Sequence, residues 1–238
     1  MHIEREMRWH LPFYFRQVLR ASLTISLPLT MSQLNLFENA ANHPASPGLH
    51  TIRDGAYYFQ PDFFTKDESD VFFTSLKEHI QWKQESMQRY GKQVNFPRLS
   101  AWYGEKGTTY TFSGVTHHPH PWTADLTDIN KRISPLAGVV FNSVLLNLYR
   151  DGNDSIAWHT DAEPELGPHP VIASVNFGAT RKFQLRHVQT KEKIEIPLTH
   201  GSLLIMQGAL QYHWQHQVPK TSKPVKERIN LTFRVIKY

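Results

Sequence analysis

The segment RINLTFRV at residues 228–235 alternates strictly between polar and apolar side chains. Alternation with a period of two is typical of a β-strand whose two faces meet different surroundings. One face carries Ile229, Leu231, Phe233 and Val235, and the other carries Arg228, Asn230, Thr232 and Arg234. The polar face either contacts solvent or lines a cavity. In a cavity, two arginines roughly 20 Å apart along the strand could bind both ends of a small dicarboxylate.

A second predicted strand, Val144–Tyr149, has the same character, since Asn147 and Tyr149 share one face amid leucines. An amide and a phenol on a largely buried strand need hydrogen-bond partners. A bound carboxylate would supply acceptors for both.

From Val139 onward the chain reads as a series of short strands bounded by Gly, Pro or polar clusters. Besides the two strands above, they are Ile172–Phe177, Lys182–His187, Lys193–Ile196 and Ser202–Met206, and the last strand extends over Arg228–Ile236. The stretch Asn176–Thr180 predicts a hairpin turn between two of them.

Helices precede these strands. Thr65 and Glu68 form a capping box at the start of one helix, and a second is predicted over Thr123–Ile133, ending before Pro135. A short strand is expected at Ala56–Phe59. Helices first and strands after them predict a mainly β protein of the α+β class, with an antiparallel sandwich or barrel and helices packed on one side.

The folded domain is expected over residues 51–238, because residues 38–50 are rich in Asn, Pro, Ala and Gly and are typical of a linker. Residues 1–50 form an N-terminal extension. Its mildly apolar stretch Ala21–Met31 leaves two readings open, a basic targeting peptide or a true start at Met31. No run of 18 apolar residues exists, so no membrane span is expected.

The composition limits which kinds of metal site, nucleophile and binding partner the chain can have. The chain contains no cysteine, which excludes disulfides, thiolate metal sites and cysteine nucleophiles. The formal net charge of +5 and the pI near 9.3 favour a polyanionic partner.

A metal site must therefore use His, Asp or Glu. In AWHTDAEPE, residues 157–165, His159 and Asp161 would lie on one side of an extended segment and could chelate one ion. The later segment QYHWQHQVP offers His213 and His216 as a third ligand. Two histidines and one carboxylate form the facial triad of non-haem Fe(II) oxygenases, which leaves positions open for a 2-oxo acid and O₂.

Several long blocks resemble the AlkB family of Fe(II)/2-oxoglutarate-dependent dioxygenases, of the type represented by human AlkB homologues 2 and 3. They are PRLSAWYGEKGTTYTFSG, NLYRDGNDSIAWHTDAEPELG, PVIASVNFGATRKFQLRH, HGSLLIMQGALQYHWQHQVP and RINLTFRVI, in the family's order. The resemblance runs from about Ala56 to the C-terminus and implies a double-stranded β-helix (jelly-roll) core.

The resemblance implies that His159, Asp161 and His216 bind Fe(II). Of the two late histidines, the resemblance favours His216 over His213, because the family's ligand opens a His-x-x-Pro-like segment, here His216-Gln217-Val218-Pro219. It also implies that Arg228 pairs with the distal carboxylate of 2-oxoglutarate and Arg234 with the carboxylate beside the iron. Asn147, Tyr149 and Asn230 would complete this pocket. The co-substrates would be 2-oxoglutarate and O₂, and the products succinate and CO₂.

The substrate implied is a nucleobase with an N-methyl lesion, such as 1-methyladenine or 3-methylcytosine in DNA, repaired by oxidative demethylation with release of formaldehyde. Such a base must leave the stack. Tyr110 and Phe112 would be the aromatic platform and Glu163 the polar reader, with Trp102 and Arg181 nearby. Because these lesions are cationic, an aromatic face and a carboxylate both suit them.

Eight basic residues are candidates for phosphate contacts, which set affinity without reading sequence. They are Arg98, Lys106, Arg181, Lys182, Arg186, Lys220, Lys223 and Lys226. Tyr90 stands where duplex-repairing relatives carry an apolar wedge, but the local match is poor. The preference for single or double strands therefore stays open.

Three other readings compete: RNA demethylation, a catalytically silent nucleic-acid binder, and an oxygenase acting on a small molecule or protein. The intact ligand and arginine set argues against the second, and Phe112, Glu163 and the basic balance argue against the third.

Residues Gln33–Phe37 (QLNLF) resemble the peptide by which bacterial repair proteins dock on the DNA sliding clamp. The protein is expected to be a monomer, located in the cytoplasm with the nucleoid in a bacterium or in the nucleus of a eukaryote.

Overall fold

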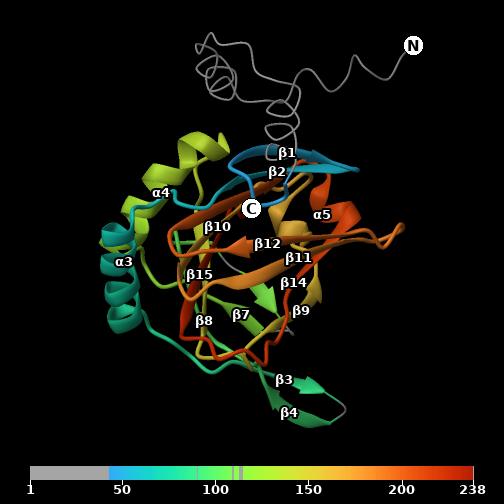
Figure 1. Ribbon diagram of the computed structural model, residues 1–238. Helices are drawn as coiled ribbons and strands as arrows, with labels where there is room; N and C mark the ends of the chain where they lie inside the picture. The colour runs from blue at the N-terminus through green and yellow to red at the C-terminus, as the bar shows by residue number, and fades with distance from the viewer. Residues whose placement is uncertain (1–42, 90, 109, 113–114, 238) are drawn as a thin grey trace, which may run out of the picture.

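The structure, a computed structural model, describes residues 43–89, 91–108, 110–112 and 115–237. Two antiparallel sheets form its centre (Figure 1). The seven-stranded sheet runs in the order β1 (Gly48–Ile52), β2 (Gly55–Gln60), β13 (Ser202–Gln207), β10 (Ile172–Gly178), β15 (Arg228–Arg234), β8 (Ser143–Tyr149) and β5 (Leu99–Gly104). Its first strand begins within the segment that the sequence assigns to the linker.

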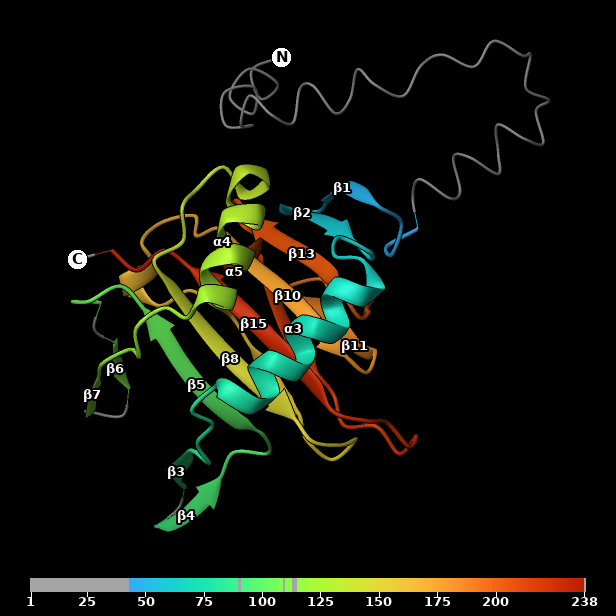
Figure 2. The ribbon, with the colours of Figure 1, turned by 90° about the vertical axis from the view of Figure 1, so that its left-hand side faces the viewer.

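The four-stranded sheet has the order β12 (Lys193–Leu198), β11 (Arg181–His187), β14 (Trp214–Val218) and β9 (Ile156–His159). Two hairpins lie apart from these sheets, β3 (Ser86–Arg89) with β4 (Lys92–Asn95), and β6 (Tyr110–Phe112) with β7 (Val115–His117). The β3–β4 hairpin projects from the body of the molecule (Figures 1 and 2).

Two helices, α3 (Lys66–His79) and α4 (Ala124–Ala137), lie against one face of the large sheet, as Figure 2 shows. Two short helices complete the described chain, α5 (Leu210–His213) and the 3₁₀ helix η1 (Pro164–Leu166). Among the described residues, no helix is long and apolar enough to cross a membrane.

The strict alternation along the strands produces two cores, one on each side of the large sheet. Leu146, Leu231 and Phe233 face α3 and α4 and are buried in the outer core. On the opposite face, Tyr149 and Met206 pack towards the small sheet in the inner core. The expected antiparallel sandwich with helices on one side is confirmed, and the polar face of β15 lies on the inner side, between the sheets.

The helix at Thr65 begins as predicted. The Glu68 backbone N–H donates to the Thr65 side chain, and the Thr65 backbone N–H donates to the Glu68 carboxylate at 2.9 Å. The predicted end of the second helix is wrong, because α4 continues through Pro135 to Ala137. Pro135 has no N–H to donate to the carbonyl oxygen of Lys131. Both residues are exposed, so water can donate to that oxygen instead. The burial of Ala137 and the left-handed cap at Gly138 hold the last turn.

The predicted hairpin at Asn176–Thr180 is also wrong. Strands β10 and β11 follow each other in sequence, but β10 pairs with β13 and β15, whereas β11 pairs with β12 and β14. The turn therefore carries the chain from one sheet to the other. Gly178 makes this crossover possible, with φ of +90° and a position where a Cβ would lie 2.4 Å from the carbonyl oxygen of Glu227.

Candidate metal centre and co-substrate pocket

Two histidines face each other across the small sheet. Strands β9 and β14 pair so that His159 lies opposite His216, and the ring centroids are 4.2 Å apart. His216 is buried on the inward side of β14 and stacks on Phe183. The antiparallel register thus brings together two side chains that are 57 positions apart in sequence.

Asp161 completes the group from the loop after β9. Its carboxylate oxygens lie 4.0 Å from His159 Nε2 and 3.9 Å from His216 Nε2. The backbone N–H of Asp161 donates to Gln211 Oε1 of α5 at 3.0 Å, which fixes the loop. The ligand atoms of the three residues all lie within 4.8 Å of one another. Two imidazoles and one carboxylate are the donor set of a facial triad for non-haem iron.

The protonation state of this group suits a metal. His159 Nδ1 lies 2.8 Å from the carbonyl oxygen of Ala157, so this nitrogen carries the proton and Nε2 keeps its lone pair. Burial, with His159 acting in the same direction, lowers the pKa of His216 to about 3. Burial alone would raise the pKa of Asp161, but Arg234 and the two histidines outweigh it and lower that pKa to about 2. At neutral pH, His216 is therefore neutral and Asp161 ionised, as metal binding requires.

The polar face of β15 points towards these ligands. Arg234 Nη2 donates to Asp161 Oδ1 at 2.9 Å, so one arginine of the strand lies beside the metal site. Arg228 stands at the other end of the strand, opposite Tyr149 of β8 and with its guanidinium 4.9 Å from the ring centroid. Asn230 lies opposite Asn147 between them.

Arg228 has the properties of an anion-binding residue. Its side chain is almost fully buried, and burial lowers its pKa to about 10, which leaves it charged at neutral pH. Nη2 donates to Asn176 Oδ1, but Nε and Nη1 meet no acceptor among the described residues. A buried cation with unpaired donors is costly unless an anion joins it. The distal carboxylate of 2-oxoglutarate fits this requirement.

Two residues of β10 belong to the pocket and are absent from the sequence prediction. Asn230 Nδ2 donates to Ser174 Oγ at 2.8 Å and to Asn176 Oδ1 at 3.2 Å. Both Ser174 and Asn176 are buried. Their alternation with Ala173, Val175 and Phe177 was the available signal.

The structure describes the side chains of only some of the expected base-contacting residues. Trp102 of β5 packs at the edge of the inner core, and its Nε1 donates to Ser143 Oγ at 2.7 Å. Glu163, two residues after Asp161, occupies the N-cap position of η1, and its side chain makes no capping hydrogen bond to that helix. The side chains of Tyr110 and Phe112 lie outside the described part of the chain, as do Tyr90 and residues 33–37. Their roles stay predictions.

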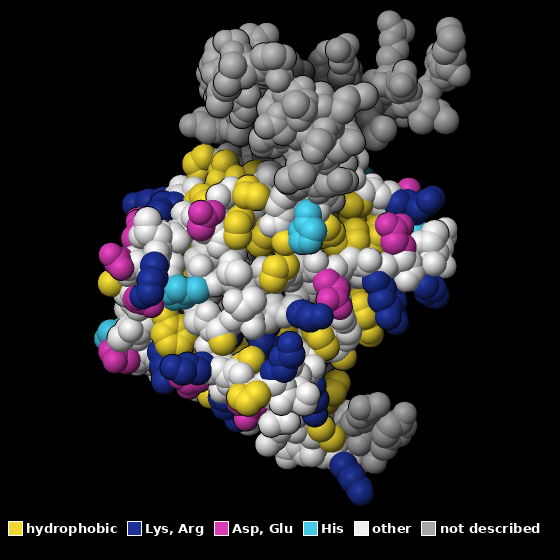
Figure 3. All heavy atoms as spheres, in the orientation of Figure 1, with side chains coloured by type: hydrophobic (Ala, Val, Ile, Leu, Met, Phe, Trp, Pro, Cys, Tyr) yellow, Lys and Arg dark blue, Asp and Glu magenta, His cyan; other side chains and the backbone are white. Residues whose placement is uncertain are grey.

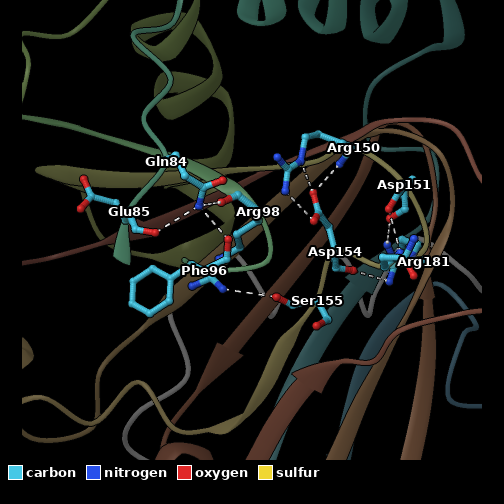
Figure 4. Close-up of polar contacts among 10 residues, drawn as sticks. Gln84, Glu85, Phe96, Arg98, Arg150, Asp151, Asp154, Ser155 and Arg181 are labelled. Carbon is cyan, nitrogen blue, oxygen red and sulfur yellow. Dashed lines mark hydrogen bonds and ion pairs between the residues drawn. The ribbon is translucent and has the colours of Figure 1, made fainter. Parts of the chain in front are cut away.

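Arg181 is buried, and its guanidinium donates hydrogen bonds to backbone carbonyl groups of the protein. It donates to the carbonyl oxygens of Asp151, Asp154 and Pro219, at distances between 2.6 and 3.0 Å. These bonds, two of which Figure 4 shows, tie together the loops that follow β8 and β14. A contact of Arg181 with a nucleobase or a phosphate stays a prediction.

His213 belongs to a different cluster, with Asp54 and His187. His187 Nδ1 accepts hydrogen bonds from the backbone N–H groups of Gln189 and Thr190, so the ring proton sits on Nε2 and faces Asp54 at 3.1 Å. An imidazole with this tautomer has no lone pair left for an ion. The group around His159 is therefore the better metal site.

Residues 55–234 match the model of the 2OG-Fe(II) oxygenase superfamily. The chain therefore belongs to this superfamily, whose members use Fe(II), 2-oxoglutarate and O₂. Within it, the chain belongs to the AlkB family, because two human members of that family are 44% and 40% identical to it over most of its length.

The human alpha-ketoglutarate-dependent dioxygenase alkB homolog 3 is 44% identical over 186 residues, covering 74% of this chain. The chain spans 64% of the length of that relative. The human DNA oxidative demethylase ALKBH2 is 40% identical over 206 residues, covering 82% of this chain and 79% of the relative. The solved structure of OsALKBH1 superposes with a TM-score of 0.56 at 18% identity, over 78% of this chain and all of the other. The expected double-stranded β-helix dioxygenase fold is confirmed.

Proposed function

We propose that this protein is an Fe(II)/2-oxoglutarate-dependent dioxygenase that removes methyl groups from N-alkylated bases in DNA, such as 1-methyladenine and 3-methylcytosine. The observation that carries the proposal is the 40% identity to human DNA oxidative demethylase ALKBH2 over most of both chains. The geometry of the pocket supports it, because Arg228 and Arg234 share the inner face of β15 and Arg234 bonds Asp161 of the candidate metal site.

His159, Asp161 and His216 would hold the iron, and Arg228 with Arg234 would hold 2-oxoglutarate. Bound iron and 2-oxoglutarate would supply, with O₂, the oxidant that hydroxylates the methyl group. The co-substrate would leave as succinate and CO₂, and the hydroxymethyl group as formaldehyde. Arg228 would orient the co-substrate at its distal end, and two of the proposed iron ligands, Asp161 and His216, are buried. Tyr110, Phe112 and Glu163 are proposed to hold the cationic base, with Trp102 at the edge of the site.

The nucleic acid would be held by charge. Lys106, Lys182, Lys220, Lys223 and Lys226 are exposed and available for phosphates. Figure 3 shows Lys and Arg side chains over much of one face, including its lower part near the β3–β4 hairpin. Such contacts set affinity and make it depend on salt.

The test uses the protein with Fe(II), ascorbate and 2-oxoglutarate on oligonucleotides that carry one 1-methyladenine or 3-methylcytosine. Single- and double-stranded DNA and RNA are separate arms, so RNA demethylation is an outcome. We expect the DNA to lose the mass of one methylene and Asp161→Ala to show no such loss. A protein that binds iron and 2-oxoglutarate but changes no oligonucleotide would refute the proposal.

We also propose that Gln33–Phe37 binds a DNA sliding clamp, that the protein is monomeric, and that it resides with DNA, in the bacterial cytoplasm or the eukaryotic nucleus. The first part is supported by the resemblance of Gln33–Phe37 to the clamp-binding peptide and by its position in the predicted N-terminal extension, where Leu34, Leu36 and Phe37 would be accessible. A pull-down with purified clamp should retain the parent and not the Leu36→Ala/Phe37→Ala variant. Equal retention of both would exclude the clamp contact.

A further inference from the structure

Arg98 lies where the projecting β3–β4 hairpin joins the large sheet, one residue before β5. The side chain of Gln84 closes the base of the hairpin, because its Nε2 lies within donating distance of the carbonyl oxygens of Glu85, Phe96 and Arg98 (Figure 4). The Arg98 backbone N–H donates to the carbonyl oxygen of Phe96 at 2.8 Å. These bonds hold the backbone at Arg98 in one place.

The guanidinium of Arg98 reaches inwards from this position. Its Nε donates to Asn147 Oδ1 at 2.7 Å, and its Nη1 donates to the carbonyl oxygen of Ser155 at 3.3 Å, the second bond being visible in Figure 4. The Ser155 N–H in turn donates to the carbonyl oxygen of Pro97 at 2.9 Å. Arg98 thus connects β8 with the loop that leads to His159.

The bond to Asn147 decides how that amide is oriented. An arginine Nε–H can only donate, so the atom of Asn147 that it meets must be the oxygen. The amide nitrogen is therefore the atom left to donate to other groups, because the oxygen is the atom that meets Arg98. Asn147 is 3% exposed as a whole, so its amide N–H groups have little access to bulk water and can donate to a molecule bound beside them.

The surroundings of Asn147 show where an acceptor would be. Asn147 shares its strand face with Tyr149 and lies opposite Asn230, within the polar row that includes Arg228. A molecule bound in the co-substrate pocket would meet these N–H groups, and 2-oxoglutarate carries carboxylate and keto oxygens that can accept from them. We infer that Arg98 is a positioning residue of this pocket, which holds the Asn147 amide so that its N–H groups donate to 2-oxoglutarate. This inference rests on the proposed function.

A role as a phosphate contact, which the sequence suggests for Arg98, would leave a different signature. A phosphate contact contributes to nucleic-acid affinity and to its salt dependence, and does not affect a small co-substrate. A positioning residue changes the affinity for 2-oxoglutarate when no oligonucleotide is present. Binding measurements separate the two roles.

The experiment measures 2-oxoglutarate binding by calorimetry, anaerobically, on the Fe(II)-loaded full-length protein without oligonucleotide. We expect Arg98→Lys, which keeps the charge and loses the Nε donor, to weaken binding roughly tenfold, the usual worth of one hydrogen bond to an ionic partner. Arg53→Lys is the matched control, because Arg53 is exposed and pairs with Glu192. Its affinity should equal that of the parent.

A double-mutant cycle tests whether Arg98 acts through Asn147. Asn147→Ala should weaken binding to a similar extent, and Arg98→Lys/Asn147→Ala should be no weaker than Asn147→Ala alone. Additive losses, or an Arg98→Lys variant with unchanged 2-oxoglutarate affinity and weaker oligonucleotide binding, would overturn the inference. A parent protein that binds iron and no 2-oxoglutarate would instead overturn the proposed function. Matching thermal unfolding midpoints for the variants exclude loss of fold as the cause.

Discussion

Arg228 and Arg234 share one face of one strand, yet their environments differ. Arg234 bonds Asp161 and so lies at the metal end of the pocket. Arg228 is buried beside Tyr149 and Asn176, with two nitrogens unpaired among the described residues. This difference supports the proposal that Arg228 recognises the distal carboxylate of 2-oxoglutarate and that Arg234 pairs with the carboxylate beside the iron.

Replacing Arg228 by lysine therefore should impair co-substrate binding. Lysine retains the charge and loses the planar pair of donors that matches a carboxylate. We expect Arg228→Lys to weaken 2-oxoglutarate binding by about 10- to 100-fold, the worth of charged hydrogen bonds. Calorimetry on the Fe(II)-loaded protein checks this. An affinity within twofold of the parent would place the co-substrate elsewhere.

The acid stability of the protein should depend in part on Glu68. Its bond to Arg132, followed by its bonds to Thr65, lowers its pKa to about 2 from an ordinary value of 4.5. Because the folded-state pKa is depressed, this stabilisation is complete above about pH 4.5 and is lost as the pH falls towards 2.

The matched variant is Glu68→Gln, which can still form a capping box but does not titrate. The free energy of unfolding, measured with urea at several pH values, should fall less steeply between pH 5 and pH 3 in Glu68→Gln than in the parent. Parallel curves would show that Glu68 does not contribute.

At the scale of elements, helix α4 contains a proline that the fold tolerates at a cost. Pro135 lies in the last turn and removes one backbone hydrogen bond. Pro135→Ala should raise the free energy of unfolding by about 1–2 kcal/mol, since the restored bond exceeds the added entropy of the unfolded chain. Pro224→Ala, in an exposed loop, should have no such effect or the opposite one. Urea denaturation of both variants decides, and a destabilised Pro135→Ala would contradict the account of this helix.

The same elements show how far the sequence alone could go. Local signals placed α3, β8 and β15 well, because capping and period-two alternation are properties of neighbouring residues. The crossover at Gly178 was misjudged because the pairing partners of a strand lie far along the chain, where no local pattern records them. Residue types and the family resemblance predicted His159, Asp161 and His216 as metal ligands, and the structure places these three side chains together. The contacts of Arg98 with Asn147 and of Asn176 with Arg228 were not predicted, because only the tertiary fold brings these residues together.

At the scale of the whole molecule, the two faces of the large sheet differ: one packs on helices and the other carries polar residues. Its outer face packs on α3 and α4, and its inner face carries the polar row, in which Arg234 bonds Asp161 of the candidate metal site. A metal and a co-substrate bound between the two sheets should therefore stabilise the entire fold by mass action.

The thermal unfolding midpoint should rise when Mn(II) is added as a redox-inert stand-in for iron, and rise further with 2-oxoglutarate. Because one carboxylate of the co-substrate is expected to bind beside the metal, its effect should largely disappear when EDTA removes the ion. Differential scanning fluorimetry measures both shifts. A 2-oxoglutarate shift that is the same with EDTA would show that the two do not share a site.

The central claim is that the iron-binding triad and the arginine pocket together perform demethylation. Its most direct test is the stoichiometry of one reaction, in which succinate and demethylated base are quantified by mass spectrometry from the same tube. The substrate is a DNA strand bearing 1-methyladenine. We predict that succinate formed in excess of a strand-free control equals the methyl groups removed, one for one, and that Asp161→Ala produces neither. Succinate without demethylation, or demethylation without succinate, would contradict the account.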